Sequence, residues 1–230
     1  MQITVKILLA SFFLMMAGLA VPLGLLYKSL PDPSSLKETD PKTTSFIQGK
    51  CRLESCPLSW SPLSGMPSFV PQAIVLAEDT RFFSHNGIDR HNILRALKIN
   101  IRSRKIVWGG SSITMQLAKN LYLKPDKTLG RKLAELVLTY KLEKTLSKER
   151  ILELYLNVAE WGPNLFGIGN ASLHYFHKEP SQLRLEEAAF LASLLPNPSL
   201  VADGDLPDRF LIAGSFLFEE LVKQYQPVVN

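Results

Sequence analysis

The sequence predicts a mainly α-helical domain that follows an N-terminal membrane segment. Apolar residues recur at helical spacing from residue 69 onward, and capping residues or prolines separate the successive helical segments. Runs that alternate apolar and polar residues, as strands do, are not convincing, and "KIVW" at 105–108 is one short candidate. The first thirty residues differ from the rest, because 7–26 carry no charge. We therefore expect a membrane anchor at 1–28, a linker at 29–68 and a folded domain at 69–230.

The uncharged run "ILLASFFLMMAGLAVPLGLL" at 7–26 has the length of a transmembrane helix. At about 1.5 Å per residue, such a run spans a hydrocarbon core of about 30 Å. Lys6 and Lys28 flank it, so the positive-inside rule gives no orientation. A cleaved signal peptide is the alternative, because the triplet "GLA" at 18–20 has the small-x-small form. The length of the run favours an uncleaved anchor.

The segment 29–68 has the composition of a linker, since prolines punctuate a stretch rich in Ser, Thr and Lys. The two cysteines of the chain, Cys51 and Cys56, lie within it in "CRLESC". In an exported chain we expect them to form a small disulfide loop. A metal pair is less favoured, because no second Cys or His pair has suitable spacing.

Helix ends in the domain can be placed from residue types alone. Pro71 is suited to open a helix, and Asp89, Ser111 and Ser147 are suited to cap later ones. The helix "LEEAAFLASLL" should end at Pro196. Apolar stripes are expected on the helix after Asp89 and on the helix from Arg131, formed by Ile93, Leu94, Leu97 and Ile101, and by Leu133, Leu136, Val137 and Tyr140.

The stretch from Arg90 to Pro125 has an unusual charge pattern. It contains eight basic residues and no Asp or Glu. Solubility alone does not require carboxylates to be excluded, so the pattern indicates a polyanionic partner. Nucleic acid is one candidate, and an anionic bilayer surface or a lipid diphosphate is the other. The preceding membrane segment favours the lipid.

Four stretches of this sequence, taken in order, resemble the motifs of the family 51 glycosyltransferases. "EDTRFFSHNGID" at 78–89 is similar to the first motif, and "GGSSITMQLAKNLYL" at 109–123 to the second. "RKLAE" at 131–135 resembles the third and "KERILELYLN" at 148–157 the fourth. The sequence departs from the family pattern at Ser112, where the family has Thr, and at Met115, where it usually has Gln. The segment after Pro198 is harder to match.

The resemblance implies a mainly helical, lysozyme-like fold and a reaction that polymerises lipid II. A C4 hydroxyl of one sugar attacks C1 of the growing chain with inversion, a β-1,4 bond forms, and undecaprenyl diphosphate leaves. Such a reaction needs a general base for the hydroxyl and positive charge for the diphosphate. Because the chain stops where a bifunctional penicillin-binding protein continues into a transpeptidase domain, we expect a monofunctional peptidoglycan transglycosylase.

The resemblance also assigns the residues of the site. It implies that Glu78 is the catalytic base and Glu135 the second acidic residue, which binds a divalent metal, Mg²⁺ or Mn²⁺, at the diphosphate; no organic cofactor is expected. It implies that Lys119 and Arg131 hold the diphosphate, and arginine suits bidentate phosphate contact. Further substrate-binding residues are expected around them, namely Ser112, Gln116, Asn120 and Lys132. By position alone, Glu78 is an ordinary helix-end carboxylate, and the motif set reverses that interpretation.

The expected partners are lipid II, the growing glycan chain, the membrane and other cell wall or division proteins, with no nucleic acid. We expect a single-pass protein of the bacterial inner membrane with its catalytic domain in the periplasm. A lysozyme-like hydrolase is the alternative enzyme, but a peptidoglycan cleaver needs no diphosphate site. A non-enzymatic assembly protein would carry a degenerate site, whereas Glu78, Lys119, Arg131 and Glu135 are all present.

Overall fold

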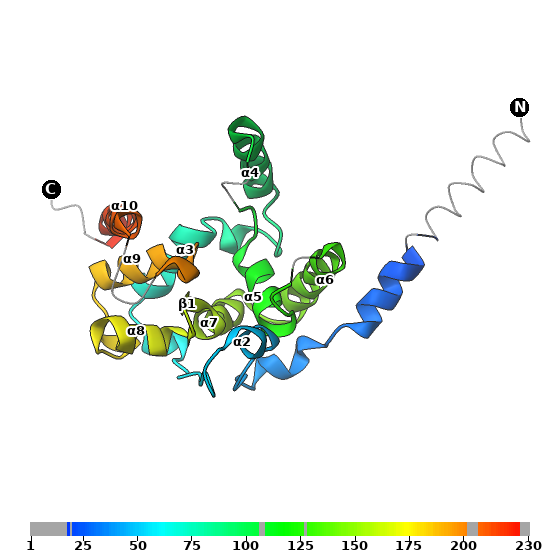
Figure 1. Ribbon diagram of the computed structural model, residues 1–230, viewed down its shortest axis with the longest axis horizontal. Coiled ribbons are helices and arrows are strands. Elements are labelled where there is room, and N and C mark those ends of the chain that lie inside the picture. The colour runs from blue at the N-terminus through cyan, green and yellow to red at the C-terminus, as the bar shows by residue number, and fades with distance from the viewer. Residues whose placement is uncertain (1–17, 19, 106–108, 127, 202–206, 226–230) are drawn as a thin grey trace, which may run out of the picture.

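The computed structural model describes residue 18 and residues 20–105, 109–126, 128–201 and 207–225, and these confirm a mainly helical fold (Figure 1). Short 3-10 helices (η) and one two-stranded hairpin join the α-helices. In chain order the elements are η1 (Pro33–Lys37), α2 (Ser45–Lys50), η2 (Leu63–Gly65), α3 (Phe69–Glu78), η3 (Phe82–Ser84), α4 (Arg90–Ser103), α5 (Ile113–Tyr122), α6 (Leu129–Thr145), α7 (Lys148–Val158), β1 (Glu160–Gly162), β2 (Leu165–Phe166), α8 (Ile168–Phe176), η4 (Pro180–Gln182), α9 (Leu185–Leu194), η5 (Pro198–Leu200) and α10 (Asp208–Tyr225).

The core lies where α3, α5, α7 and α9 meet, and α10 packs against α9 and α3. Its largest fully buried side chains include Trp161, Tyr155 and Phe82. Burying aromatic and aliphatic side chains of this size supplies most of the driving force for such a fold. By contrast, α4 stands away from the other helices (Figure 1). Among the helices α2 to α10, α4 therefore projects from a packed body (Figure 1).

The predicted helix caps are largely confirmed. Asp89 accepts hydrogen bonds from the backbone N–H of His91 and Asn92, and Ser147 caps α7 in the same way. The last predicted helix ends at Leu194, ahead of Pro196. Two starts differ from the prediction by one or two residues. Ser112 rather than Ser111 caps α5, and α3 begins at Phe69, two residues before the proline that was expected to open it.

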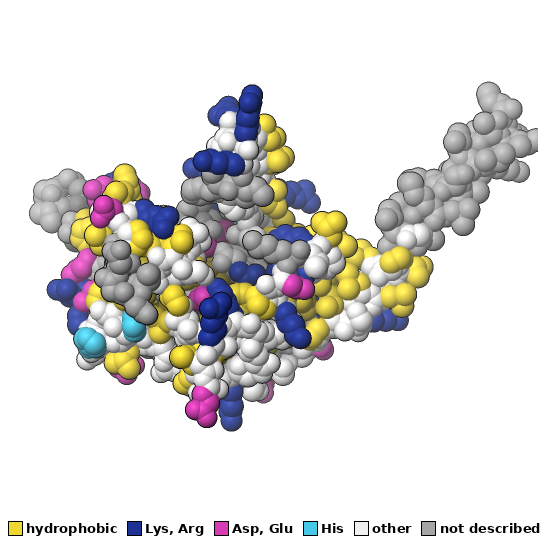
Figure 2. All heavy atoms as spheres, in the orientation of Figure 1, with side chains coloured by type: hydrophobic (Ala, Val, Ile, Leu, Met, Phe, Trp, Pro, Cys, Tyr) yellow, Lys and Arg dark blue, Asp and Glu magenta, His cyan; other side chains and the backbone are white. Residues whose placement is uncertain are grey.

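The predicted apolar stripes do not face the core. On α4, Leu94 and Leu97 are more than half exposed, and Ala96 is the buried residue. On α6, Leu133 is 55% exposed, whereas the buried face contains Leu138 and Leu142. Figure 2 shows basic side chains gathered on α4, with apolar side chains along another side of the same helix. The helical spacing of apolar residues predicts an amphipathic helix, but it does not predict which part of the protein covers each face of that helix.

A short antiparallel hairpin was not predicted from the sequence. It is formed by β1 and β2, and its residues Trp161 and Phe166 are buried. Strands this short are below the length at which an alternating pattern can be recognised. The one strand candidate of the sequence, 105–108, lies mostly outside the described residues.

The segment 29–68 was expected to be a linker, yet it packs against the domain. Leu36 and Met66 join the main core, and Phe46 and Ile47 of α2 form a small cluster with Phe166 of β2. Cys51 and Cys56 are joined by a disulfide, as expected, and pack against that cluster. High proline content therefore described the composition of this segment but not its packing.

The expected membrane anchor falls mainly outside the described residues, although 20–29 are helical. Among the residues that the structure describes, no helix combines the length and the apolar character needed to cross a membrane.

Candidate active site

A cleft of about 1110 Å³ opens between the ends of several helices. It collects charged side chains from segments far apart in the sequence. The predicted site residues that line it are Glu78, Gln116, Lys119, Asn120, Arg131, Lys132 and Glu135. The structure thus brings together all but one of the site residues expected from the sequence.

Glu78 reaches the cleft because it is the last residue of α3. Its carboxylate accepts a hydrogen bond from the Gln116 side-chain amide of α5, and its Oε1 is buried with no partner among the described residues. Gln116 in turn accepts a hydrogen bond from the Tyr155 hydroxyl of α7 at 3.1 Å. Tyr155 is fully buried, and burial raises the pKa of its hydroxyl well above the ordinary value, so it remains a donor. Tyr155 thereby orients Gln116, and Gln116 orients the carboxylate.

Burial in the cleft shifts the pKa values of Glu78 and Lys119 in opposite directions, toward each other. Burial raises the pKa of the Glu78 carboxyl, and the Gln116 hydrogen bond and the Lys119 charge oppose this rise. Burial lowers the pKa of the Lys119 ammonium, while the charges of Glu135 and Glu78 raise it. A carboxylate with a raised pKa is a better proton acceptor, so Glu78 has the properties of a general base.

Asp79 does not share the role of its neighbour. It is buried, and its backbone leaves the helix, with φ at −159°. Its carboxylate lies 3.0 Å from the His85 Nε2 and accepts the Ile113 backbone N–H at 3.1 Å. Since Ile113 is the first residue of α5, Asp79 ties the end of α3 to the start of α5. Asp79 and His85 therefore have a structural role at this turn.

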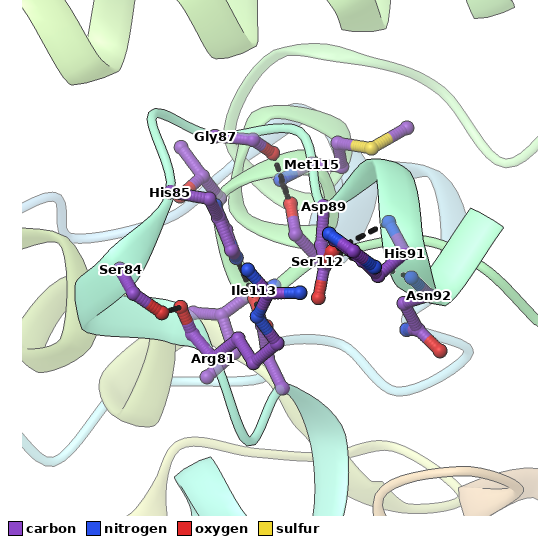
Figure 3. Close-up of polar contacts among 12 residues, drawn as sticks. Arg81, Ser84, His85, Gly87, Asp89, His91, Asn92, Ser112, Ile113 and Met115 are labelled. Atoms are coloured by element: carbon purple, nitrogen blue, oxygen red, sulfur yellow. Dashed lines mark hydrogen bonds and ion pairs between the residues drawn. The ribbon is translucent and has the colours of Figure 1, made fainter. Parts of the chain in front are cut away.

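Ser112 is the one predicted site residue that the structure does not bring to the cleft. It is fully buried, and its hydroxyl donates to the Gly87 carbonyl and accepts the Met115 backbone N–H (Figure 3). The hydroxyl therefore fastens the N-terminus of α5 to the loop before α4. Its neighbour Ser111 lines the cleft instead and accepts a hydrogen bond from Lys132 at 3.4 Å.

Arg131, Lys132 and Glu135 form a cluster on α6. Lys132 contacts one oxygen of the Glu135 carboxylate, and Arg131 lies 3.5 Å from the other. The spacing of three and four residues puts all three on one helical face. Glu135 is only 3% exposed, so the two cations neutralise a buried carboxylate. Arg131 and Lys132 also line the cleft. Glu135 therefore forms ion pairs with both neighbouring cations, and these pairs orient the Arg131 and Lys132 side chains.

The donors around Glu135 do not form a metal site by themselves. Among the described residues, the group of three acidic or histidine side chains with closely spaced ligand atoms is Asp79, His85 and Asp89, and Glu135 is not part of it. Asp79 is occupied by the contacts described above, and Asp89 caps α4. Glu135 is already paired with two cations, and their positive charge would oppose the binding of a metal ion beside them.

Sequence reasoning missed part of the cleft wall. Lys50 of α2 contacts Glu160 of β1 and donates to the Ser199 hydroxyl at 3.1 Å, and all three residues line the cleft. Glu160 is only 8% exposed, and its charge also favours the charged form of Lys119. A buried carboxylate in the apolar stretch "NVAEWG" was a signal, but its partner lies more than a hundred residues earlier in the chain.

This geometry combines a partly buried carboxylate with a strip of cations in one cleft. It is suited to a transfer reaction in which a hydroxyl loses a proton and a phosphorylated group leaves. The transglycosylase family model matches residues 51–212, and the chain belongs to that family.

The most informative relatives are peptidoglycan enzymes. The chain is 42% identical over 166 residues to a biosynthetic peptidoglycan transglycosylase of Herminiimonas arsenicoxydans, which covers 69% of this chain and 72% of that protein. It is 44% identical over 167 residues to the protein of the same description from Nitrosomonas eutropha, covering 69% and 68%. It is 37% identical over 225 residues to penicillin-binding protein 1A of Aquifex aeolicus, covering 93% of this chain and 31% of that larger protein.

Proposed function

We propose that this protein polymerises lipid II into β-1,4-linked glycan strands and releases undecaprenyl diphosphate. It is a peptidoglycan transglycosylase of cell wall biosynthesis, since the family match and relatives named for that activity agree. The observation that carries the finer proposal is the juxtaposition of Glu78, a partly buried carboxylate, with Lys119 and Arg131 in one cleft. A hydrolase of glycan strands would not need that cationic strip.

In the proposed mechanism, Glu78 accepts the proton of the C4 hydroxyl that attacks the sugar. Gln116 holds one oxygen of the carboxylate, and the other, Oε1, makes no hydrogen bond to the described residues. Lys119, Arg131 and Lys132 hold the diphosphate as the C1–oxygen bond breaks, because negative charge accumulates there. The Asn120 Oδ1, which is buried without a partner among the described residues, can accept an N–H or O–H of a sugar.

We propose Glu135 as the residue that would hold a divalent cation at the diphosphate. When bound, such an ion would supply further positive charge to the diphosphate. The residues present already place two cations beside Glu135, so the positive charge is available from the chain itself.

We also propose that the enzyme acts at the bacterial inner membrane, with the N-terminal segment as its anchor and the domain in the periplasm. The uncharged run at 7–26 and the basic, partly apolar surface of α4 support this. A membrane location would confine enzyme and lipid-linked substrate to one surface and raise their effective concentration. Contacts with other cell wall or division proteins remain part of the same proposal.

The experiment is a polymerisation assay with purified protein and lipid II. Longer glycan and free undecaprenyl diphosphate are the expected products, whereas fragments from sacculi would indicate a hydrolase. Glu78→Gln keeps the shape of the side chain but removes the base, so turnover should fall at least about a hundredfold. Lipid II binding should change little, because the diphosphate is held elsewhere.

Glu149→Gln is the matched control, since Glu149 is an exposed carboxylate on α7 outside the cleft. It should polymerise like the wild type. Substantial turnover by Glu78→Gln with normal binding would mean that Glu78 is not the base, and Glu135 would be the first candidate to test next.

A further inference from the structure

Phe46 of α2 lies against the cation that the proposed function places on the diphosphate. Its ring centroid is 5.3 Å from the Lys119 Nζ. A lysine ammonium within about 6 Å of an aromatic centroid is attracted by the negative face of the ring. Residues 45–50 of α2 precede the matched residues 51–212, so this ring comes from outside the family motifs that carry the rest of the site.

The position of Phe46 is fixed by contacts on several sides. The side chain is only 8% exposed and packs with Ile47 and Phe166. At the end of the same helix, Lys50 contacts Glu160 and donates to Ser199, so α2 is held against the edge of the cleft. In Figure 1, α2 lies beside α5, and the two helices are in contact. A ring that is held this firmly can orient the side chain that rests on it.

The surroundings of Lys119 explain why an aromatic contact is useful there. Burial disfavours the ammonium, the carboxylates of Glu135, Glu78 and Glu160 favour it, and Arg131 repels it. A carboxylate in direct contact would occupy the N–H donors and compete with a phosphate oxygen. An aromatic face favours the charged form and leaves those donors available.

We propose that Phe46 is a positioning residue that keeps the Lys119 ammonium charged and directed at the substrate diphosphate. The inference rests on the proposed function, because it needs a diphosphate in the cleft. Phe46 itself need not touch the reacting atoms.

The test replaces Phe46 in the full chain with 4-fluoro-, 3,5-difluoro- and pentafluorophenylalanine. These analogues keep the shape of the ring but weaken its negative face step by step. The value of kcat/KM with lipid II should fall progressively, by about 3- to 30-fold over the series. The same series at Phe166, a buried ring of the same cluster without a lysine over it among the described residues, should leave kcat/KM within about twofold.

Three outcomes would overturn the inference. A wild-type enzyme that polymerises lipid II, with a flat fluorination series at Phe46, would show that the ring acts only by packing. The Lys50 ammonium also lies 5.5 Å from the Phe46 centroid, so the series is repeated in Lys50→Met. A dependence that disappears there would assign the effect to Lys50 instead of Lys119. A wild-type chain that does not polymerise lipid II would overturn the proposed function and this inference together.

Discussion

Replacing Gln116 with methionine should move the acid limb of the pH–rate profile to higher pH. Gln116 donates a hydrogen bond to the Glu78 carboxylate, and this bond favours the ionised form. A hydrogen bond to a charged group is worth about 1.5–3 kcal/mol, and 1.36 kcal/mol corresponds to one pH unit. Losing the bond should therefore raise the pKa of Glu78 further. As the proposed base, Glu78 is active only when deprotonated. The acid limb of kcat/KM should therefore shift upward by about 1–2 pH units.

The assay is polymerisation of lipid II at a series of pH values, with the unfolding midpoint of each variant measured alongside. Tyr155→Phe is the matched control, because it removes the hydrogen bond to the far end of Gln116 and leaves the contact with Glu78. Its acid limb should move much less. If Gln116→Met lowers kcat/KM equally at every pH, Gln116 acts by binding substrate, and the reasoning about the pKa of Glu78 is refuted.

Three further variants test other parts of the structure. Lys119→Ala should weaken both lipid II binding and turnover, because charge on the diphosphate exists before the reaction and grows during it; binding isotherms and single-turnover rates separate the two effects. Cys51→Ser should lower the free energy of unfolding by about 2 kcal/mol, the loop-closure term for so short a loop, and leave polymerisation nearly intact. Complete loss of activity would show that the disulfide is required for polymerisation and does not only stabilise its own loop. Gly87→Ala should cost about 1–3 kcal/mol in urea unfolding, because Gly87 has φ +84° and an added Cβ would lie 2.6 Å from the Thr139 Cγ2; an unchanged midpoint would contradict that strain.

The parts of the fold that the sequence predicted are the local ones. Asp89 and Ser147 cap helices because their short oxygen-bearing side chains reach the nearest backbone N–H groups, a property of a few residues. The disulfide could be predicted for the same reason, since Cys51 and Cys56 are close in sequence. The motifs also named most of the residues that line the cleft, since seven of the eight predicted site residues lie there.

The parts that failed depend on packing between distant segments. Leu94 and Leu133 satisfy a helical stripe, yet both are exposed, because the core covers other faces of their helices. Lys50 and Glu160 meet across more than a hundred residues, and no local pattern links them. Ser112 sits inside a motif, but its hydroxyl serves the backbone of α5 and the Gly87 carbonyl rather than the cleft. The motif placed Ser112 in the right segment of the chain, but it did not show which groups its hydroxyl contacts.

The adjacent carboxylates Glu78 and Asp79 lie in different surroundings because α3 ends between them. At Asp79 the backbone turns out of α3, so successive side chains point to different surroundings. The Asp79 carboxylate contacts the His85 ring and accepts the Ile113 backbone N–H, so its polar partners lie within the fold. Glu78 keeps one buried oxygen without a partner, and burial raises its pKa. Its contribution to stability is full below the ordinary carboxyl pKa and is lost as the pH rises through the raised value. Above that range the ionised Glu78 carboxylate costs stability, because its desolvation is only partly compensated by the Gln116 hydrogen bond and the Lys119 charge.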